Sequence, residues 1–168
     1  MTDTHSSGQT PKASRPDSPA GYWRSRPIPW RWAQQRLIAA RNYWIVTVSP
    51  EGKPHARPVW GVLVDDVIYF DTGSRIGTHL MGNPDVTVHL ESGDEVVIVE
   101  GTAERVEDAP RTAAFIEAYN AKYEAALDAP PGALFAVQPR VAFGWVADPT
   151  FYDAGAIFGS TGTRWDFE

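Results

Sequence analysis

Hydrophobic and polar residues follow two different periods along the chain, and the changes of period divide it into helices and strands. Apolar residues recur at helical spacing between Pro29 and Arg41, which predicts a helix there. Two further helices are expected over 75–81 and 109–127. Runs of β-branched and aromatic residues predict strands over 43–48, 54–64, 67–70, 86–90, 95–106, 140–147 and 162–167. Short strands joined by tight turns favour an antiparallel barrel, which removes sheet edges.

Two glycines interrupt the pattern of the predicted strands. Gly61 lies in the middle of the second strand, and Gly101 lies in the long strand that begins at Glu95. A glycine inside a strand marks a bulge or a close approach of the backbone to another group. We therefore expect an irregularity at both positions.

The first 21 residues differ in composition from the rest of the chain. They contain Ser, Thr, Pro, Gly and Asp, with no aromatic residue and almost nothing apolar. Such a segment cannot bury enough apolar surface to offset the entropy of ordering it. The sequence therefore predicts a disordered tail over 1–21 and one domain over 22–168.

Composition and charge exclude several classes of protein. The chain has 168 residues, no cysteine and a formal net charge of −6. The absence of cysteine excludes disulfides and thiolate chemistry, and net acidity argues against a nucleic-acid partner. No apolar run approaches the roughly 18 residues that a membrane span needs. The N-terminus lacks the apolar core of a secretory signal, so we expect a cytoplasmic protein.

The charge is distributed unevenly along the chain. Residues 22–60 carry seven Lys or Arg residues against Glu51 alone, whereas the remainder of the domain is strongly acidic. A local positive field of this kind attracts an anionic ligand. The same basic residues are equally compatible with a solvated helix face.

A strand, a glycine turn and a helix start follow one another between Tyr69 and Arg75. Ser74 is a good N-cap, and the free N–H groups of a helix start attract phosphate or carboxylate. Arg75 adds a charged fork suited to phosphate, and His79, one helical turn later, is placed to reach the same anion. The alternative is an ordinary capped helix with a surface arginine.

A second group of candidate residues lies within the strand predicted over 54–64. Arg57 in an otherwise apolar strand needs a carboxylate or a ligand anion as its partner. Pro58 favours a strand edge or a bulge, and Trp60 next to Gly61 offers a flat wall for an aromatic ring. The alternative is a core tryptophan beside an exposed arginine.

No residue pattern in the chain indicates a metal site or a protein nucleophile. The four histidines (His5, His55, His79 and His89) lack ligand-like spacing, and no nucleophile-elbow pattern is present. A possible anion site with aromatic walls suits an enzyme whose cofactor carries the reaction.

Taken in order, these segments resemble the pyridoxamine-5′-phosphate-oxidase-like split β-barrel superfamily, and within it the flavin and deazaflavin oxidoreductases common in actinobacteria. The likeness extends from Trp30 to Phe167. Its landmarks, in chain order, are Trp30 to Arg41, Tyr43-Trp44, Gly52-Lys53-Pro54-His55, Arg57-Pro58-Val59-Trp60, Gly73-Ser74-Arg75, Asn83-Pro84, His89 to Val97 and Thr163-Arg164-Trp165. Each landmark is weak alone, and their order and spacing together are specific.

The resemblance implies a fold, an assembly and a cofactor. The implied fold is mainly β, a six-stranded antiparallel split β-barrel with two to three helices. The implied assembly is a homodimer with two cofactor sites at the subunit interface. The implied cofactor is coenzyme F420, a deazaflavin with an anionic oligoglutamate tail, with FMN as the alternative. The implied partners are thus a second copy of the chain, the cofactor and a small-molecule substrate.

The resemblance also assigns cofactor-binding residues. Phosphate or tail ligands are Arg57, Ser74 and Arg75. Ring contacts come from the stretch Pro58, Val59, Trp60 and Gly61. The segment that approaches the ribityl phosphate contains Phe70 and Thr72, and Thr72 supplies a donor there. A terminal motif that closes over the site, from the partner subunit, contains Arg164 and Trp165.

Two positions depart from the true oxidase, and they shift the expected activity. Ile76 stands where the oxidase has a phosphate-holding lysine, and Val96 stands where it has a flavin-contacting glutamine. The oxidase's C-terminal substrate-binding extension is also missing from the sequence. We therefore expect an oxidoreductase that transfers a hydride from reduced deazaflavin to an unsaturated or quinone-like small molecule. The alternatives are an FMN-dependent oxidoreductase and a non-catalytic carrier of flavin or heme.

Overall fold

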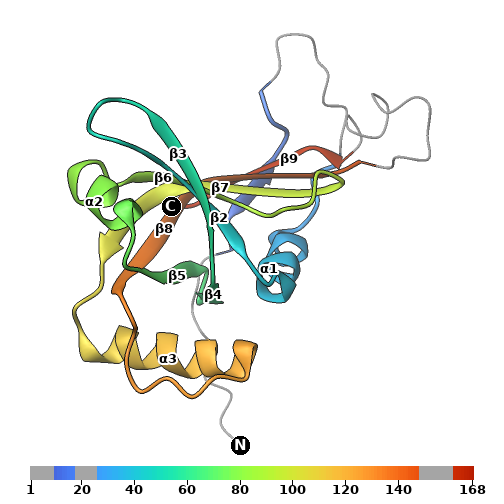
Figure 1. Cartoon of the computed structure of the whole chain (residues 1–168). Helices are drawn as coiled ribbons and strands as arrows, with labels where there is room; N and C mark the ends of the chain where they lie inside the picture. The colour runs from blue at the N-terminus through green and yellow to red at the C-terminus, as the bar shows by residue number, and fades with distance from the viewer. Residues whose placement is uncertain (1–9, 18–25, 148–160) are drawn as a thin grey trace, which may run out of the picture.

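The computed structural model describes residues 10–17, 26–147 and 161–168. Within these ranges the chain forms nine strands and three helices (Figure 1). In chain order they are β1 (Lys12–Ser14), α1 (Trp30–Ala39), β2 (Tyr43–Val48), β3 (Pro54–Val59), β4 (Gly61–Val64), β5 (Val67–Thr72), α2 (Arg75–Gly82), β6 (Asp85–His89), β7 (Glu95–Arg105), α3 (Ala109–Tyr123), β8 (Ala133–Val146) and β9 (Thr163–Asp166).

All the strand pairs are antiparallel and belong to one sheet. The hydrogen-bonded order is β1-β9-β8-β7-β6-β2-β3, and β5 joins β4 to this path by pairing with β8. β3 pairs with β2 and β4 pairs with β5, so that the sheet does not close between β3 and β4 among the described residues. This mainly β architecture, an unclosed barrel with three helices, confirms the predicted split-barrel fold.

The strand predicted over 54–64 is divided at Trp60 into β3 and β4, which pair with different neighbours. A Cβ atom on Gly61 would lie 2.7 Å from the carbonyl oxygen of Tyr69 and 2.9 Å from Cδ2 of Tyr43. Only glycine fits this gap, which confirms the predicted close approach of the backbone. Trp60 therefore lies where the chain passes from one half of the barrel to the other.

The irregularity predicted at Gly101 is confirmed as a β-bulge. The pairing of β7 with β8 shifts register between Glu100 and Gly101. A Cβ on Gly101 would overlap the carbonyl oxygen of Gln138 on β8. The bulge lets the two longest strands stay paired while they bend around the core.

Two apolar clusters hold the helices on the sheet. One lies beneath α1, where the buried Trp30 and Leu37 pack near Trp165 of β9, with the Trp30 and Trp165 rings edge to face at 5.4 Å. The other lies beneath α3, where Phe115 and Tyr119 pack on the half of the barrel formed by β4, β5 and β8. This second cluster fixes α3 beside the β3–β4 junction (Figure 1).

The structure differs from the expected disordered tail at Lys12–Ser14, which form β1. These residues pair with β9, so that Ala13 lies opposite Trp165. The expectation rested on side chains that cannot bury apolar surface, whereas β1 is held by main-chain hydrogen bonds to a strand edge. The rest of the predicted tail, residues 1–9 and 18–21, lies outside the described residues.

The ends of two elements also differ from prediction. β8 begins at Ala133 rather than Arg140, because its first half pairs with β5 on one side and β7 on the other. α3 ends at Tyr123 rather than Leu127, because Glu124 turns left-handed at φ 51° and Asn120 binds the Leu127 backbone. None of the helices in the described ranges is long and apolar enough to cross a membrane.

Candidate functional site

The ends of β3 and β5, the start of α2 and the side of α3 enclose a cleft of about 600 Å³, called here the Arg57 cleft. Its lining residues are Arg57, Val59, Trp60, Asp71, Thr72, Gly73, Ser74, Tyr119 and Pro131. Five of the residues assigned to cofactor binding from the sequence thus meet in one cavity, although Arg57 and Ser74 come from separate strand ends.

The floor of the cleft has the local structure of an anion site. The Ser74 hydroxyl caps α2 by accepting a hydrogen bond from the Ile76 N–H at 3.4 Å. The hydroxyls of Thr72 and Ser74 lie 2.8 Å apart, and the Ser74 N–H donates to Thr72 Oγ1 at 3.1 Å. Gly132 packs against this turn so closely that a Cβ there would lie 2.6 Å from the Thr72 carbonyl carbon. The turn is therefore held rigidly below the open side of the cleft.

Arg57 supplies a positive charge with no counterion of its own. Five other arginines pair with carboxylates: Arg36 with Glu95, Arg105 with Glu107, Arg111 with Glu104 and Asp108, Arg140 with Asp85, and Arg164 with Asp166. Arg57 forms no ion pair with any described residue, and its side chain is exposed at the edge of β3. Its guanidinium is therefore free to bind a ligand anion.

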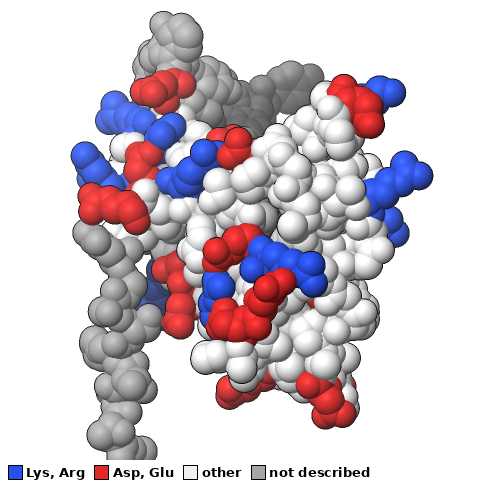
Figure 2. Space-filling view, turned by 90° about the vertical axis from the view of Figure 1, so that its left-hand side faces the viewer, with Lys and Arg blue, Asp and Glu red and all other residues white. Residues whose placement is uncertain are grey.

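Basic and acidic side chains are mixed on one face of the molecule (Figure 2). Figure 2 shows Lys and Arg lying beside Asp and Glu on one face rather than gathering into a separate basic patch. The excess of basic residues over 22–60 is therefore partly neutralised by acidic residues from later in the chain, as in the contact of Arg36 with Glu95. Arg31, Arg41 and Lys53 also form no ion pair with a described residue, but unlike Arg57 they do not line the Arg57 cleft.

Asp71 places a carboxyl group in the same cleft, and the residue assignment from the sequence did not include it. Burial raises the pKa of Asp71, and backbone hydrogen bonds at Asp71 and Gly132 offset that effect only in part. An ionised Asp71 accepts hydrogen bonds from hydroxyl groups and repels a phosphate. Arg57 and Asp71 can therefore bind different parts of one ligand, an anionic group at Arg57 and a hydroxyl group at Asp71.

Trp60 forms the aromatic wall of the cleft. Its ring is 44% exposed and stacks on Tyr123, with ring centroids 4.8 Å apart and planes within 9°. The Arg41 guanidinium lies 5.4 Å from the ring centroid on this tryptophan. The stacked ring is thus fixed in orientation and still accessible, as the sequence-based suggestion of a flat wall requires.

Other predicted site residues lie outside the cleft. Phe70 is fully buried and stacks on Phe135, and Trp165 is fully buried with its indole N–H donating to the Ile28 carbonyl at 3.0 Å. Because both side chains are taken up by the core, they are not available to a ligand in this protomer. The sequence could not distinguish aromatic residues that pack in the core from those that bind a ligand, since both occur at the same alternating positions of a strand.

His79 also differs from its predicted place beside the anion. It is buried beneath the β2–β3 hairpin, and its Nδ1 lies 3.0 Å from the Thr47 hydroxyl. The ring packs edge to face with His55 at 5.3 Å, away from the cleft lining. His79 does lie one helical turn after Arg75, but its side chain is buried together with Ile76 and Leu80, whereas Arg75 is exposed.

The remaining predicted residues lie at the margins. Arg75 and Pro58 are exposed, and Gly61 is buried behind Trp60; none of the three lines the cleft. Arg164 forms a two-pronged ion pair with Asp166, with N–O distances of 2.7 to 3.1 Å. A closing role for Arg164 and Trp165 in a partner subunit stays a prediction, because no second chain is present.

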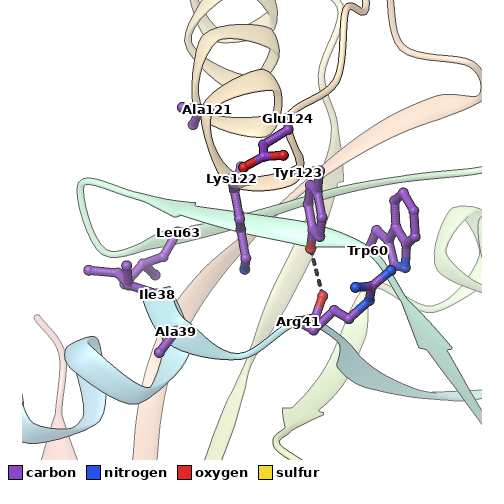
Figure 3. A pocket seen from close by; sticks show the side chains of 11 residues that line it. Ile38, Ala39, Arg41, Trp60, Leu63, Ala121, Lys122, Tyr123 and Glu124 are labelled. Carbon is purple, nitrogen blue, oxygen red and sulfur yellow. Dashed lines mark hydrogen bonds between the residues drawn. The ribbon is translucent and has the colours of Figure 1, made fainter.

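A second cavity, called here the Lys122 pocket, lies on the other side of Trp60 and has a volume of about 780 Å³. Its lining residues are Ile38, Ala39, Arg41, Trp60, Val62, Leu63, Ala118, Ala121, Lys122, Tyr123 and Glu124. Figure 3 shows the Lys122 side chain extending from α3 into the space between Leu63 and Tyr123. Trp60 is the residue that the linings of the two cavities share.

Lys122 is held by neutral oxygen atoms. Its Nζ donates to the Gly61 carbonyl at 2.8 Å and to the Tyr43 hydroxyl at 3.2 Å. Burial lowers the pKa of Lys122 to about 8 and raises that of Tyr43 well above its ordinary value. The sequence carried a signal for this residue, since Lys122 follows Phe115 and Tyr119 at the spacing of one helix face.

The comparisons with known proteins agree with this architecture. A family model described as pyridoxamine 5′-phosphate oxidase matches residues 33–146. No curated protein sequence matches the chain. The solved structure of a conserved hypothetical protein, Rv2991, from Mycobacterium tuberculosis is similar with a TM-score of 0.62 and 21% identity, over 82% of this chain and 90% of that one.

Two further solved structures are similar in fold. One is an F420 reductase, with a TM-score of 0.51 and 22% identity over 64% of this chain and 94% of that one. The other is a heme binding protein from Mycobacterium smegmatis, with a TM-score of 0.58 and 19% identity over 80% of this chain and 62% of that one. At such identities the likeness concerns the fold alone.

Proposed function

Because the chain belongs to the pyridoxamine 5′-phosphate oxidase family, we propose that it is an oxidoreductase that holds a flavin-type cofactor in the Arg57 cleft. The proposed cofactor is the deazaflavin coenzyme F420, and the proposed reaction is hydride transfer to an unsaturated or quinone-like small molecule. In this proposal two copies of the chain form a dimer with the cofactor at their interface, as the family resemblance implies.

One observation carries the proposal. The Arg57 cleft joins an arginine with no ion pair among the described residues, a capped helix start and an exposed tryptophan face within about 600 Å³. A phosphate, a polyhydroxylated chain and a flat ring need these three kinds of group together. The residues present therefore fit a phosphorylated ring cofactor, and the volume is in the usual range for such ligands.

The chain's own residues contribute binding, orientation and exclusion of water. Arg57 and the turn at Ser74 would hold the phosphate, and the Asp71 carboxyl would accept hydrogen bonds from hydroxyl groups of the linking chain. Trp60, fixed by its stack on Tyr123, would set the plane of the ring. When bound, the cofactor supplies the hydride chemistry that these side chains lack.

The choice of deazaflavin over FMN rests on two observations. Ile76, which stands where the true oxidase holds phosphate with lysine, is fully buried in the core, so this position supplies no charge to a phosphate. One fold neighbour is an F420 reductase. FMN is the alternative cofactor.

The deciding experiment compares dissociation constants of the purified protein for F420, FMN and heme by calorimetry. Binding of F420 at least tenfold tighter than FMN is expected. The reverse order would assign the cleft to FMN, and failure to bind either would remove the proposal. Ser74→Ala, which deletes the cap hydroxyl at the cleft floor, should weaken the bound cofactor, whereas Ser92→Ala in a distant exposed turn should not.

A non-catalytic carrier is the second candidate, favoured by the fold similarity to a heme binding protein. Enzyme and carrier differ in turnover. Protein loaded with reduced F420 would be mixed with a panel of enones and quinones while the cofactor's absorbance is followed. Oxidation at a saturable rate supports the enzyme, and a cofactor that stays reduced across the panel supports the carrier.

A further inference from the structure

We propose that the Lys122 pocket binds small organic monocarboxylates with an apolar body. The carboxylate would lie at the Lys122 ammonium, and the body between an aliphatic and an aromatic wall. The inference rests on the residues of this pocket and does not require the cofactor proposed for the Arg57 cleft. The two cavities meet only at Trp60, so each can be tested without the other.

The charge of Lys122 is the first part of the argument. An ammonium group has three N–H donors, and two of them go to the Gly61 carbonyl and the Tyr43 hydroxyl. No described Asp or Glu forms an ion pair with Lys122. A partly buried cation without a counterion is costly, and a ligand carboxylate that accepts the third hydrogen bond relieves this cost.

The walls of the pocket supply the second part. On one side lie Ile38 and Leu63, and on the other the stacked pair of Trp60 and Tyr123 (Figure 3). Ile38 is 59% exposed and Trp60 is 44% exposed, so both present apolar surface that a ligand would remove from water. A volume of about 780 Å³ accommodates a ring or a short chain in addition to the carboxylate.

The other charges of the pocket limit the ligand to one anionic group. Arg41 is directed over the Trp60 ring, with its guanidinium carbon 5.4 Å from the ring centroid. Glu124 lines the same pocket and would repel a second anion. A doubly charged phosphate is also disfavoured, because Glu124 would repel its second charge.

The test uses 4-phenylbutyrate and its uncharged analogue 4-phenylbutyramide as probes, titrated into the full-length protein by calorimetry at pH 7. We expect the amide to bind at least about tenfold more weakly, because a neutral carbonyl oxygen replaces the charged carboxylate as the acceptor for the Lys122 ammonium. Lys122→Met should abolish the difference, and Lys122→Arg should keep it. Lys53→Met, at an exposed lysine in the β2–β3 turn, is the matched control and should behave like the unmodified protein.

A pH series tests the same charge without a substitution. The affinity for 4-phenylbutyrate should fall as the pH rises through about 8, where Lys122 loses its proton. The neighbouring Tyr43 and Tyr123 stay protonated there because burial raises the pKa of both hydroxyls. The other charged side chains that line the pocket are Arg41 and Glu124.

The proposal is overturned by equal affinity for acid and amide, by no binding of either probe, or by a Lys122→Met protein that keeps the preference. Circular dichroism melting shows whether each variant is folded, and the pH series on the unmodified protein decides the question if Lys122→Met fails to fold. All titrations are made without cofactor. A failure of the protein to bind a cofactor in the Arg57 cleft would therefore leave the result for the Lys122 pocket unchanged.

Discussion

The Arg57 cleft and the Lys122 pocket lie on opposite sides of one tryptophan and are built in different ways. The cleft takes most of its polar groups from consecutive residues, the strand–turn–helix segment from Asp71 to Ser74. The pocket takes its lining from α1, β4 and α3, which are far apart in sequence. The cleft offers an arginine fork and a carboxyl, whereas the pocket offers the Lys122 ammonium between an aliphatic and an aromatic wall. A split in one strand thus creates two chemically distinct cavities.

The largest expected effect is the loss of cofactor affinity when Arg57 is removed. Arg57→Ala should weaken the preferred cofactor at least tenfold, because a charged hydrogen bond contributes about 1.5–3 kcal/mol. Calorimetric titration measures the change. Arg75→Ala is the comparison, since Arg75 was given the same role from the sequence but does not line the cleft. Equal losses in the two variants would place the anion between both arginines rather than in the cleft.

The junction between the two cavities depends on Gly61. Gly61→Ala should lower the free energy of unfolding by about 1–3 kcal/mol, the usual cost of forcing extra atoms into a packed site. The added methyl would meet the Tyr69 carbonyl oxygen at 2.7 Å, where no flexible side chain can move away. Urea denaturation measures the loss. Gly93→Ala, at a glycine with nothing within 4 Å of its added Cβ, should cost far less.

Trp60 is the wall that both cavities share. Trp60→Ala should weaken the cofactor in the cleft and 4-phenylbutyrate in the pocket by about threefold to tenfold each, from the loss of about 0.5–1.5 kcal/mol of aromatic contact. Trp60→Phe should retain most of both affinities. Titration of the two ligands into the same variant separates the cavities, because an effect on one ligand alone would show that only one uses this wall.

The smallest effect is a pH dependence of stability from Lys122. Its folded pKa, about 8, lies below its ordinary value of 10.5, so the unfolded chain binds more protons between these values. Stability contributed by this group therefore rises as the pH increases from about 8 toward 10. Subtracting the urea stability of Lys122→Met from that of the unmodified protein at pH 7.5 and 9.5 isolates this contribution, and a difference that falls with pH would contradict the assignment.

Most of the fold could be predicted from local pattern. β2 and α2 have clear periods and turn residues at their ends, and their predicted and observed bounds agree to within a residue. β1 could not be predicted, because three polar residues form a strand only when the edge of β9 is available to pair with them. The first half of β8 was missed for a similar reason, since its order comes from two neighbouring strands.

The candidate site was predictable where its residues are contiguous. The cap at Ser74 and the turn before it follow from residue types that act locally. This reasoning fails for Phe70, His79 and Trp165, because an aromatic or histidine side chain in a helix or strand can lie either in the core or at the surface. The packing of the helix or strand against the rest of the protein determines which of the two occurs, and a single sequence does not show that packing.

The sequence by itself carried the resemblance to the family, and with it the split-barrel class, through the order and spacing of its motifs. It also determined the helix cap at Ser74 and the close approach at Gly61, since each depends on local sterics. Only the tertiary structure decided that Arg57 faces Ser74 across a cleft, and that Lys122 reaches the Gly61 carbonyl from a helix that begins at Ala109. The physical reason is that local propensities act over a few residues, whereas a cavity forms where distant elements fail to fill the space between them.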